Sequence, residues 1–399
     1  MHRFSALWLI VCLVAASCGS NDTPAADPTT DPTPTAVEQP APTATPEPPA
    51  ALRIATYNAG LAEGFVPYAT ERRPLVVDAI GDLSADIVFV QEFWDSESVA
   101  ALRDATVESF PNTMFPDPIA DEGGGEPACT IDELADLEAC VELNCSDASP
   151  DELVACVLSS CAAQYNGLCV ECQSCIAANV GSTVEEAITN CTLASAAFAY
   201  EGSLGTGLLS AGVILDTDVL VLESSLTRRA VVYALVDTEA FGPVHVFGTH
   251  LSAVFADIPF PGDGTWEQEQ AAQIVTLLDF VGSKAARGEP VVLLGDFNTG
   301  PAGETYEAEV GANYELLSAE LPMNPYVANG DGLCTFCGDN PLVGSDSSVV
   351  IDHIFVRDFD GTASTTRVLD ELVDIDVEGT PTTSALSDHF GLLSTLTPD

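Results

Sequence analysis

Short apolar runs that end in polar residues recur along this chain. Residues 291–294 are Val-Val-Leu-Leu, and a glycine, Asp296 and Asn298 come soon after them. An unbroken apolar run of this length is typical of a buried strand, and the glycine marks its end. Because side chains alternate along a strand, Asp296 and Asn298 are expected on the same side. The pattern predicts a core strand that presents a carboxylate and an amide at one edge of a sheet.

Four other segments repeat this pattern. Strands are predicted at residues 53–58, 86–92, 244–251 and 350–356, and a Ser-Asp-His triplet occupies residues 387–389. In α/β folds the strand ends converge where ligands bind. We therefore expect a single site that gathers the other polar side chains at these ends, namely Asn58, Glu92, His250, Asp352, Asp388 and His389.

Each motif also has a plainer structural interpretation. An Asp-x-Asn pair after a strand is frequently a turn, and one histidine at a strand end is more often structural than catalytic. His245 has no counterpart in the pattern and His353 lies inside a predicted strand, so we expect both to be structural. The functional prediction therefore depends on all the motifs together and on their order.

In order and identity, these segments resemble the endonuclease/exonuclease/phosphatase superfamily of metal-dependent phosphoesterases, from about residue 52 to residue 396 with one insertion. The resemblance implies an α/β fold, a four-layer α/β sandwich with two packed mixed β-sheets and helices outside. Gly-Thr-His-Leu at residues 248–251 is similar to the branch of sphingomyelinases, pancreatic-type deoxyribonucleases and inositol-polyphosphate phosphatases. Thr335, Phe336 and Asn340 are similar to motifs of bacterial and neutral sphingomyelinases.

The resemblance also implies a metal site built from oxygen ligands. Glu92 is the expected principal ligand, with Asn58 beside it, and Asp388 either contributes at a second cation position or supports the histidine next to it. The expected cation is Mg²⁺, with Mn²⁺ or Ca²⁺ as alternatives. Some relatives carry an acid two residues after the first asparagine. Here that position is Gly60, which leaves a second metal there without support.

The remaining polar residues would handle the proton and the phosphate. By resemblance His389 takes the proton from water, and Asp352 holds its imidazole in the required tautomer. Asp296 and Asn298 would orient the water and the phosphoryl oxygens. His250 would donate to the phosphate or assist the leaving group.

Nine cysteines gather between residues 122 and 197, where the composition changes. Capping-box patterns that begin at Thr130, Ser149 and Ser182 predict helix starts in this insert. In an exported protein the expected outcome is a disulfide framework with one cysteine free or paired elsewhere, and this disfavours a zinc or iron–sulfur site at residues 169–175. The nine are Cys129, Cys140, Cys145, Cys156, Cys161, Cys169, Cys172, Cys175 and Cys191.

The insert divides a catalytic domain expected at residues 51–121 and 198–399. It either gates or extends the substrate cleft or is a remote stabilising addition, and the sequence does not choose between these alternatives. Cys334 and Cys337 are expected to form a separate local disulfide. An amphipathic helix is predicted at residues 266–286 as part of the scaffold.

The N-terminus has the pattern of an exported lipoprotein. Residues 7–16 are apolar but too few to span a bilayer, and Ala-Ala-Ser-Cys at residues 15–18 resembles a bacterial lipobox. We therefore predict a signal peptide at residues 1–17, lipidation of Cys18, and an outer-membrane or cell-surface location. Residues 18–50 contain nine prolines and predict a disordered tether, with a reach of at most about 100 Å.

Charge narrows the choice of substrate. The chain has 11 lysines and arginines against 61 acidic residues, for a net charge of −50, and Lys284 is its single lysine. Nucleic-acid binding depends on cationic contacts to phosphates, so we expect no tight nucleic-acid partner. Arg72-Arg73 and Arg228-Arg229 are the only adjacent cationic pairs, and together they are expected to hold a single phosphate at most.

These observations predict a Mg²⁺-dependent phosphoesterase that hydrolyses a phosphodiester, in a lipid headgroup or a small phosphoester, by metal-assisted attack of water. One alternative is an extracellular nuclease, which the charge disfavours. Another is a surface binding protein on an inactive hydrolase scaffold, which the complete set of polar residues disfavours. No protein partner is indicated by the sequence.

Overall fold

The computed structural model describes residues 50–117, 127–148, 150–179, 182–193, 198–255, 258–261 and 263–399. The predicted signal peptide, Cys18 and all but the last residue of the predicted tether lie outside the described residues. Within the described part of the chain, no helix combines the length and the apolar character needed to cross a membrane.

The first of two large sheets has six strands in the order β10-β13-β1-β2-β4-β3. β1 pairs in parallel with β2 and antiparallel with β13, so the sheet is mixed. The central strand β2 carries an unbroken apolar run at residues 87–90, as expected for a strand covered on both faces. The strands are β1 Leu52–Asn58, β2 Ile87–Gln91, β3 Asn112–Met114, β4 Gly207–Ser210, β10 Gly361–Val368 and β13 Gly391–Pro398.

The second sheet has five strands in sequence order. β7 and β8 pair in parallel, and the remaining neighbours are antiparallel. The register sets His250 opposite Asp296, and Asp296 opposite Asp352, so three predicted site residues share one row. The strands are β5 Val213–Leu222, β6 Arg229–Thr238, β7 Gly242–His250, β8 Val291–Asp296 and β9 Asp352–Arg357.

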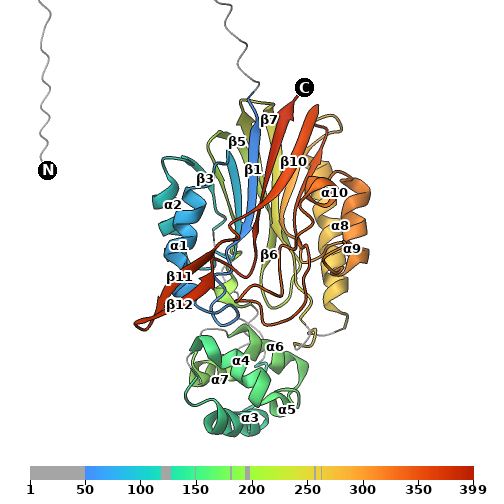
Figure 1. The fold of residues 1–399 in the computed structure, drawn as a ribbon. Helices are drawn as coiled ribbons and strands as arrows, with labels where there is room; N and C mark the ends of the chain where they lie inside the picture. Colours follow the sequence, from blue (N-terminus) through green and yellow to red (C-terminus); the bar gives the residue numbers. More distant parts are fainter. Residues whose placement is uncertain are drawn as a thin grey trace, which may run out of the picture. The chain divides into compact units, whose positions relative to one another are not determined.

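The two sheets pack face to face, with the main core between them (Figure 1). Phe89 of β2 lies directly over Gly248 of β7, where an added Cβ would come within 2.1 Å of the ring. Helices cover the outer faces, so the predicted four-layer α/β sandwich is confirmed. They are α1 Ala69–Gly81 and α2 Ser96–Thr106 on the first sheet, and α8 Trp266–Lys284 and α9 Gly311–Glu320 on the second, with α10 Pro325–Asn329 nearby.

Two smaller elements complete the body of the molecule. β11 Leu372–Val377 and β12 Thr380–Ala385 form a separate two-stranded sheet that projects from one side (Figure 1). A short 3₁₀ turn, η1 Tyr200–Gly202, follows the insert. The helix predicted at residues 266–286 is confirmed as α8. Its N-cap is Thr265, whose side chain accepts a hydrogen bond from the Gln268 amide.

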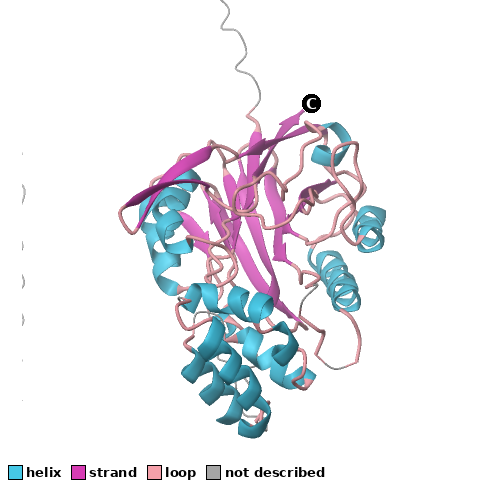
Figure 2. Ribbon diagram, turned by 60° about the horizontal axis from the view of Figure 1, so that its bottom comes forward, coloured by secondary structure: helices cyan, strands magenta, loops and turns pink. Residues whose placement is uncertain are grey.

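The cysteine-rich insert is a cluster of short helices at one end of the sheets (Figure 2). Four disulfides join its helices, so the predicted framework is confirmed and the metal-cluster alternative at residues 169–175 is wrong. Cys169 is the free cysteine, and Cys334–Cys337 forms the predicted local disulfide. The helices are α3 Ile131–Asn144, α4 Pro150–Ser160, α5 Ala162–Tyr165, α6 Val170–Ala178 and α7 Val184–Leu193. The bridges are Cys129–Cys172, Cys140–Cys161, Cys145–Cys156 and Cys175–Cys191.

Helix capping in the insert follows the sequence at one place and departs from it at another. Thr130 and Glu133 form the predicted capping box. At the start of α7 the box uses Thr183 and Glu186 in place of Ser182 and Glu185, with the Glu186 amide donating to Thr183 Oγ1 at 3.3 Å. Two overlapping Ser/Thr-x-x-Glu patterns exist in this stretch, and the position of the first helical turn selects the second.

Candidate active site

All eight side chains predicted for the site come together at one end of the two sheets. Asn58 ends β1, and Glu92 directly follows β2. His250, Asp296 and Asp352 lie side by side at the ends of β7, β8 and β9 in the other sheet. Most of them line a cavity of about 390 Å³, while Asn58 and Asp352 lie buried beside it; the lining set includes Glu92, His250, Asp296, Asn298, Asp388 and His389.

Asp296 is the centre of this arrangement. Its Oδ2 accepts a hydrogen bond from Asn58 Nδ2 at 3.0 Å and lies 3.4 Å from His250 Nε2. Its Oδ1 accepts from the backbone amide of Asn298 at 2.8 Å, in a turn where Asn298 has a φ of 49°. Burial raises the pKa of Asp296 to about 6, against the opposing charge of His389. The carboxylate therefore joins the two sheets at the floor of the cavity.

His389 and Asp352 form a buried acid–histidine pair. Nδ1 of His389 lies 2.9 Å from Asp352 Oδ2, and Nε2 faces Asp296 Oδ2 at 3.8 Å. Burial opposes a charge on His389, but Asp352 and then Asp296 outweigh it, and the pKa of His389 is held well above its usual value. The pair fixes the tautomer so that Nε2 is the nitrogen directed toward the cavity.

The motif residues Thr335, Phe336 and Asn340 support this pair. Thr335 Oγ1 accepts from the Asp352 amide at 3.2 Å, and the Phe336 ring packs against His389 with centroids 5.1 Å apart. Asn340 Nδ2 donates to the Ser387 carbonyl at 2.8 Å, just before Asp388 and His389 in the chain. These residues therefore hold the acid and the base in position.

Glu92 has the properties of a cation ligand. Its Oε1 accepts from Asn58 Nδ2 at 3.3 Å, whereas its Oε2 is buried with no hydrogen-bond partner among the described residues. Burial, followed by the charge of Asp388, raises the pKa of Glu92 to about 7. A divalent cation would satisfy the orphaned oxygen and neutralise the neighbouring carboxylate. The oxygen-only donor set of Glu92 and Asp388 fits a hard cation.

Asn58 and Gly60 shape the same corner. Asn58 Oδ1 accepts from the Gly60 amide at 3.0 Å, so the amide nitrogen of Asn58 is the atom that faces Glu92 and Asp296. In this orientation Asn58 holds the carboxylates in place and presents no oxygen to a cation. Gly60 has a φ of 57°, and an added Cβ would lie 2.4 Å from Asp388 Oδ1. The glycine thus leaves room for Asp388.

Asp296, Asp352 and His389 also offer three potential ligand atoms within 4.8 Å of one another. The His389–Asp352 hydrogen bond already occupies Nδ1, which argues for proton transfer here and not for metal binding. The orphaned oxygen of Glu92 is the better cation position.

His250 is buried beside these groups but carries no charge. Burial, with smaller contributions from Arg229 and His389, keeps the pKa of His250 well below its usual value. Its Nδ1 is buried without a hydrogen-bond partner in the described part of the chain, and its Nε2 faces Asp296. A neutral imidazole can donate one hydrogen bond to a phosphoryl oxygen.

Arg229 lines the cavity although the sequence placed it only in a pair of arginines and not among the site residues. It is the first residue of β6, its side chain is buried, and Nε and Nη1 have no hydrogen-bond partner among the described residues. Burial lowers the pKa of Arg229 to about 10, while Glu92 and Asp296 favour its charge. The scarcity of cationic residues in this chain was the signal in the sequence that could have pointed to Arg229. In the structure, the start of β6 lies beside the end of β7 in the antiparallel register, which brings Arg229 close to His250.

The four paired arginines do not cluster, contrary to expectation. Arg72 is fully buried and donates to backbone carbonyls, including Leu386 at 2.6 Å, and Arg73 pairs with Glu97 at 3.2 Å. Arg228 lies over the Phe198 ring at 4.2 Å. Of these four arginines, only Arg229 lines the cavity.

Comparison with known proteins agrees with this geometry. A family model described as the Endonuclease/Exonuclease/phosphatase family matches residues 55–389. The chain belongs to this family. No curated protein sequence matches.

Solved structures share the fold of this family member. Sphingomyelinase C from Streptomyces griseocarneus has a TM-score of 0.55 and 16% identity, covering 87% of this chain and 100% of its own. A Staphylococcus aureus beta toxin mutant with bound magnesium ions has a TM-score of 0.54 and 14% identity, covering 87% and 100%. A family protein from Bacteroides thetaiotaomicron has a TM-score of 0.51 and 14% identity, covering 88% and 100%.

Membership of the endonuclease/exonuclease/phosphatase family makes this chain a phosphoric ester hydrolase. The family generally uses a divalent metal ion, and the corner formed by Glu92 and Asp388 fits one. His245 and His353 lie outside the cavity lining, as expected. His353 bonds Thr299 O and Asn324 at 2.9 Å each, and His245 bonds the Tyr233 hydroxyl at 3.0 Å.

Proposed function

We propose that this protein is a Mg²⁺-dependent phosphodiesterase that hydrolyses a lipid headgroup or a small phosphoester with water. The observation that carries the proposal is that one cavity gathers two complementary kinds of group. Glu92 and Asp388 offer anionic oxygens, and Arg229 and His250 offer unsatisfied nitrogen atoms. A phosphoryl group in this cavity would meet a cation-binding corner and hydrogen-bond donors together.

The chain's own residues can carry out the proton transfers of hydrolysis. Because the pKa of His389 is raised, only its neutral form can act as a base, and a cation beside Asp388 would favour that form by opposing the charge on the imidazole. In the neutral form, Nε2 of His389 accepts a proton from water as the water oxygen bonds to phosphorus, while Asp352 stabilises the resulting imidazolium. Asp296, beside His389 Nε2, orients that water. The bond from phosphorus to the leaving oxygen then breaks, and the leaving oxygen takes a proton from solvent water. A bound divalent cation supplies neutralisation of the phosphoryl charge.

His250 and Arg229 would serve the phosphate in different ways. Because the pKa of His250 is well below its usual value, it acts as a neutral donor and not as a charged general acid. This favours contact with a phosphoryl oxygen over protonation of the leaving group. Arg229 keeps its charge near neutral pH and can form a bidentate contact to phosphate oxygens.

The cationic content of the cavity favours a small substrate over nucleic acid. Arg229 is the single arginine or lysine among the described residues that line it. One arginine can hold one phosphate, whereas a duplex needs a track of cations against a net charge of −50. The extracellular nuclease alternative therefore gains no support from the site.

The experiment is a substrate panel with the full-length protein. Sphingomyelin, phosphoinositides, linear DNA and bis-p-nitrophenyl phosphate are each tested with and without Mg²⁺. We expect Mg²⁺-dependent hydrolysis of a lipid or a small diester to exceed DNA cleavage, and loss of turnover in Glu92→Gln. Efficient nicking of duplex DNA, with no activity on lipids or small diesters, would favour the nuclease function over the proposed one.

We further propose that the protein is an exported bacterial lipoprotein of the outer membrane or cell surface, bound to the membrane through lipidated Cys18. Five disulfides among the described residues support an oxidising compartment. Cys18→Ser should move the protein from the membrane pellet to the soluble fraction. A variant that still pellets would show that the lipobox pattern is accidental.

A further inference from the structure

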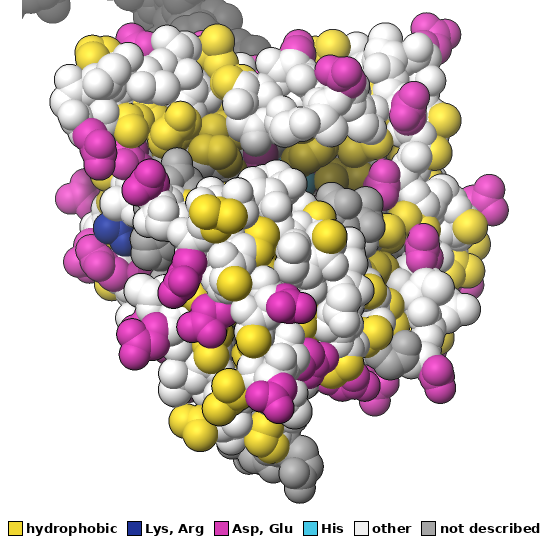
Figure 3. All heavy atoms as spheres, turned by 90° about the horizontal axis from the view of Figure 1, so that it is seen from below, with side chains coloured by type: hydrophobic (Ala, Val, Ile, Leu, Met, Phe, Trp, Pro, Cys, Tyr) yellow, Lys and Arg dark blue, Asp and Glu magenta, His cyan; other side chains and the backbone are white. Residues whose placement is uncertain are grey.

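The catalytic cavity has an apolar wall beside its polar floor. Ala253, Val254 and Phe255, on the loop that follows β7, line the cavity together with Phe65 and Val66 from the loop after β1. Viewed from this end, a histidine is visible deep in the hollow and hydrophobic side chains lie along part of its edge (Figure 3). These five side chains offer no hydrogen-bond donor or acceptor to a substrate.

The loop after β7 is attached to the insert. Phe255 packs edge-on against Trp266, the first residue of α8, with ring centroids 5.1 Å apart. Trp266 Nε1 donates to the Ile258 carbonyl at 2.8 Å. Trp266 and Ile258 form one buried cluster with Ala177 and Ala178 of α6, against which Val254 and Phe255 pack.

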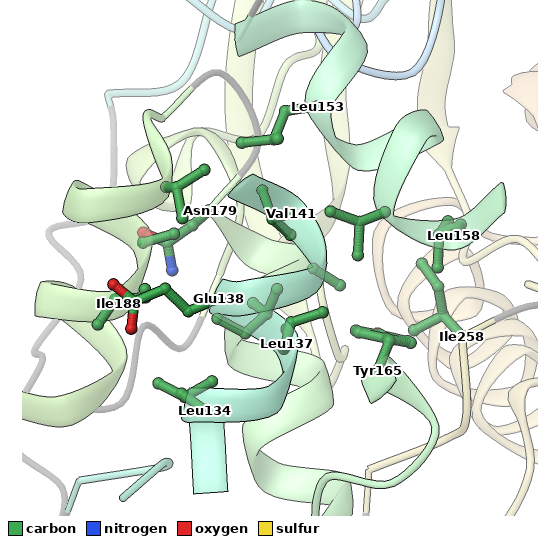
Figure 4. A pocket seen from close by; sticks show the side chains of 15 residues that line it. Leu134, Leu137, Glu138, Val141, Leu153, Leu158, Tyr165, Asn179, Ile188 and Ile258 are labelled. Atoms are coloured by element: carbon green, nitrogen blue, oxygen red, sulfur yellow. The ribbon is translucent and has the colours of Figure 1, made fainter. Parts of the chain in front are cut away.

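Ile258 is shared between the loop and the core of the insert. It is 4% exposed and lines the insert's own apolar cavity of about 50 Å³, beside Leu158 and Tyr165 (Figure 4). The helix that contacts it, α6, is joined to α7 by the Cys175–Cys191 disulfide. The insert therefore packs against the loop that forms part of the cavity wall, and it is not a remote addition.

We propose that this apolar wall is a subsite for the hydrocarbon part of a phosphodiester, such as the alkyl chains beside a lipid phosphate, and that the insert positions it. The subsite rests on the proposed phosphodiesterase function and specifies its substrate class. A sugar or a nucleobase needs polar partners, which this wall lacks. Hydrocarbon needs none, and each methylene that it buries is worth about fourfold in affinity.

The alkyl subsite is tested with p-nitrophenyl alkyl phosphates that range from methyl to octyl. The diester and the leaving group stay the same along the series, and only the alkyl chain changes. We expect kcat/KM to rise by up to about fourfold per methylene until the wall is covered. A kcat/KM independent of chain length would overturn the subsite.

The role of the insert is tested with Ile258→Ser and the conservative Ile258→Val. Ile258→Ser should lower the ratio of kcat/KM for the octyl ester to kcat/KM for the methyl ester by more than tenfold. Ile258→Val should keep the wild-type ratio. Val275→Ser, at an exposed apolar position of α8, is the matched control and should behave as wild type. An equal loss along the whole series in Ile258→Ser would contradict a positioning role.

Two readouts do not depend on turnover. Hydrogen exchange of the described residues 251–255 should quicken in Ile258→Ser while β1 and β8 stay protected, and unchanged exchange would overturn the attachment of the loop to the insert. Calorimetry should show tighter binding of octyl phosphate than of methyl phosphate, and equal affinities would overturn the subsite. If no ester is hydrolysed but octyl phosphate binds tightly, the proposed function fails and the subsite stands.

Discussion

The body of the molecule and its cysteine-rich insert reach stability in different ways. The body packs two sheets around a shared core, with residues from β1, β2, β7, β8 and β9 buried between them. The insert contains short helices whose buried cluster includes six cysteines, and four disulfides join them. A segment of this size buries only a modest core, and the covalent links add to its stability.

The catalytic groups lie in the body of the molecule and not in the insert. The body holds buried carboxylates whose pKa values are raised, to about 7 for Glu92 and about 6 for Asp296, which is unfavourable without a partner cation. Burying such groups costs free energy, which the extensive core of the body offsets. The insert has no comparable buried acid among its described residues, and its contribution to the site is a hydrophobic contact through Ile258.

The largest effect is expected from substitutions that abolish catalysis in the body of the molecule without unfolding it. His389→Ala and Asp296→Asn should each reduce hydrolysis of bis-p-nitrophenyl phosphate by ~10²–10⁴-fold, because a base or a water-orienting carboxylate is lost. Steady-state kinetics and circular dichroism measure the two effects. His245→Ala, on the same strand as His250 but outside the cavity lining, is the control and should keep wild-type activity. If both site variants keep more than about a tenth of the wild-type rate, the proposed roles of His389 and Asp296 are wrong.

The second test removes a covalent link from the insert. The Cys175–Cys191 bridge spans 16 residues, so the Cys175→Ala and Cys191→Ala double variant should destabilise the insert by about 3 kcal/mol. Hydrogen exchange should quicken in α6 and α7 and stay slow in β1 and β8. Cys169→Ser, at the exposed free thiol, should change stability by less than about 0.5 kcal/mol. Equal loss of protection in the strands would show that the two regions unfold together.

The third and smallest effect is a pH dependence of metal binding that the body alone should show. Because the pKa of Glu92 is raised to about 7, protons compete with a cation below that pH and the carboxylate is free to bind above it. Calorimetry should find Mg²⁺ affinity falling by about tenfold per pH unit below about pH 7. Mg²⁺ should also raise the melting temperature more at about pH 8 than at about pH 6. Equal affinity at both values would exclude Glu92 as the ligand.

Much of the catalytic end could be predicted from the sequence because its signals are local. An apolar run followed by polar residues predicts a strand and places its last side chains, and this holds for Asn58, Glu92, Asp296 and the strand before His250. The order of these motifs indicated the family, and the Thr130 capping box marked a helix start. These signals are local because they depend on residues within a few positions of one another.

Other features were decided only by the tertiary structure. The approach of Arg229 to the cavity depends on the pairing of β6 with β7, and the disulfide partners in the insert depend on how its helices pack. The orientation of Asn58 is set by Gly60 and by carboxylates from two sheets. The sequence left open whether the insert takes part in the site, and the answer came from Ile258, which contacts helices far from it in the chain. Periodicity along the chain determines local structure, whereas strand register and packing between distant segments determine which of these side chains meet.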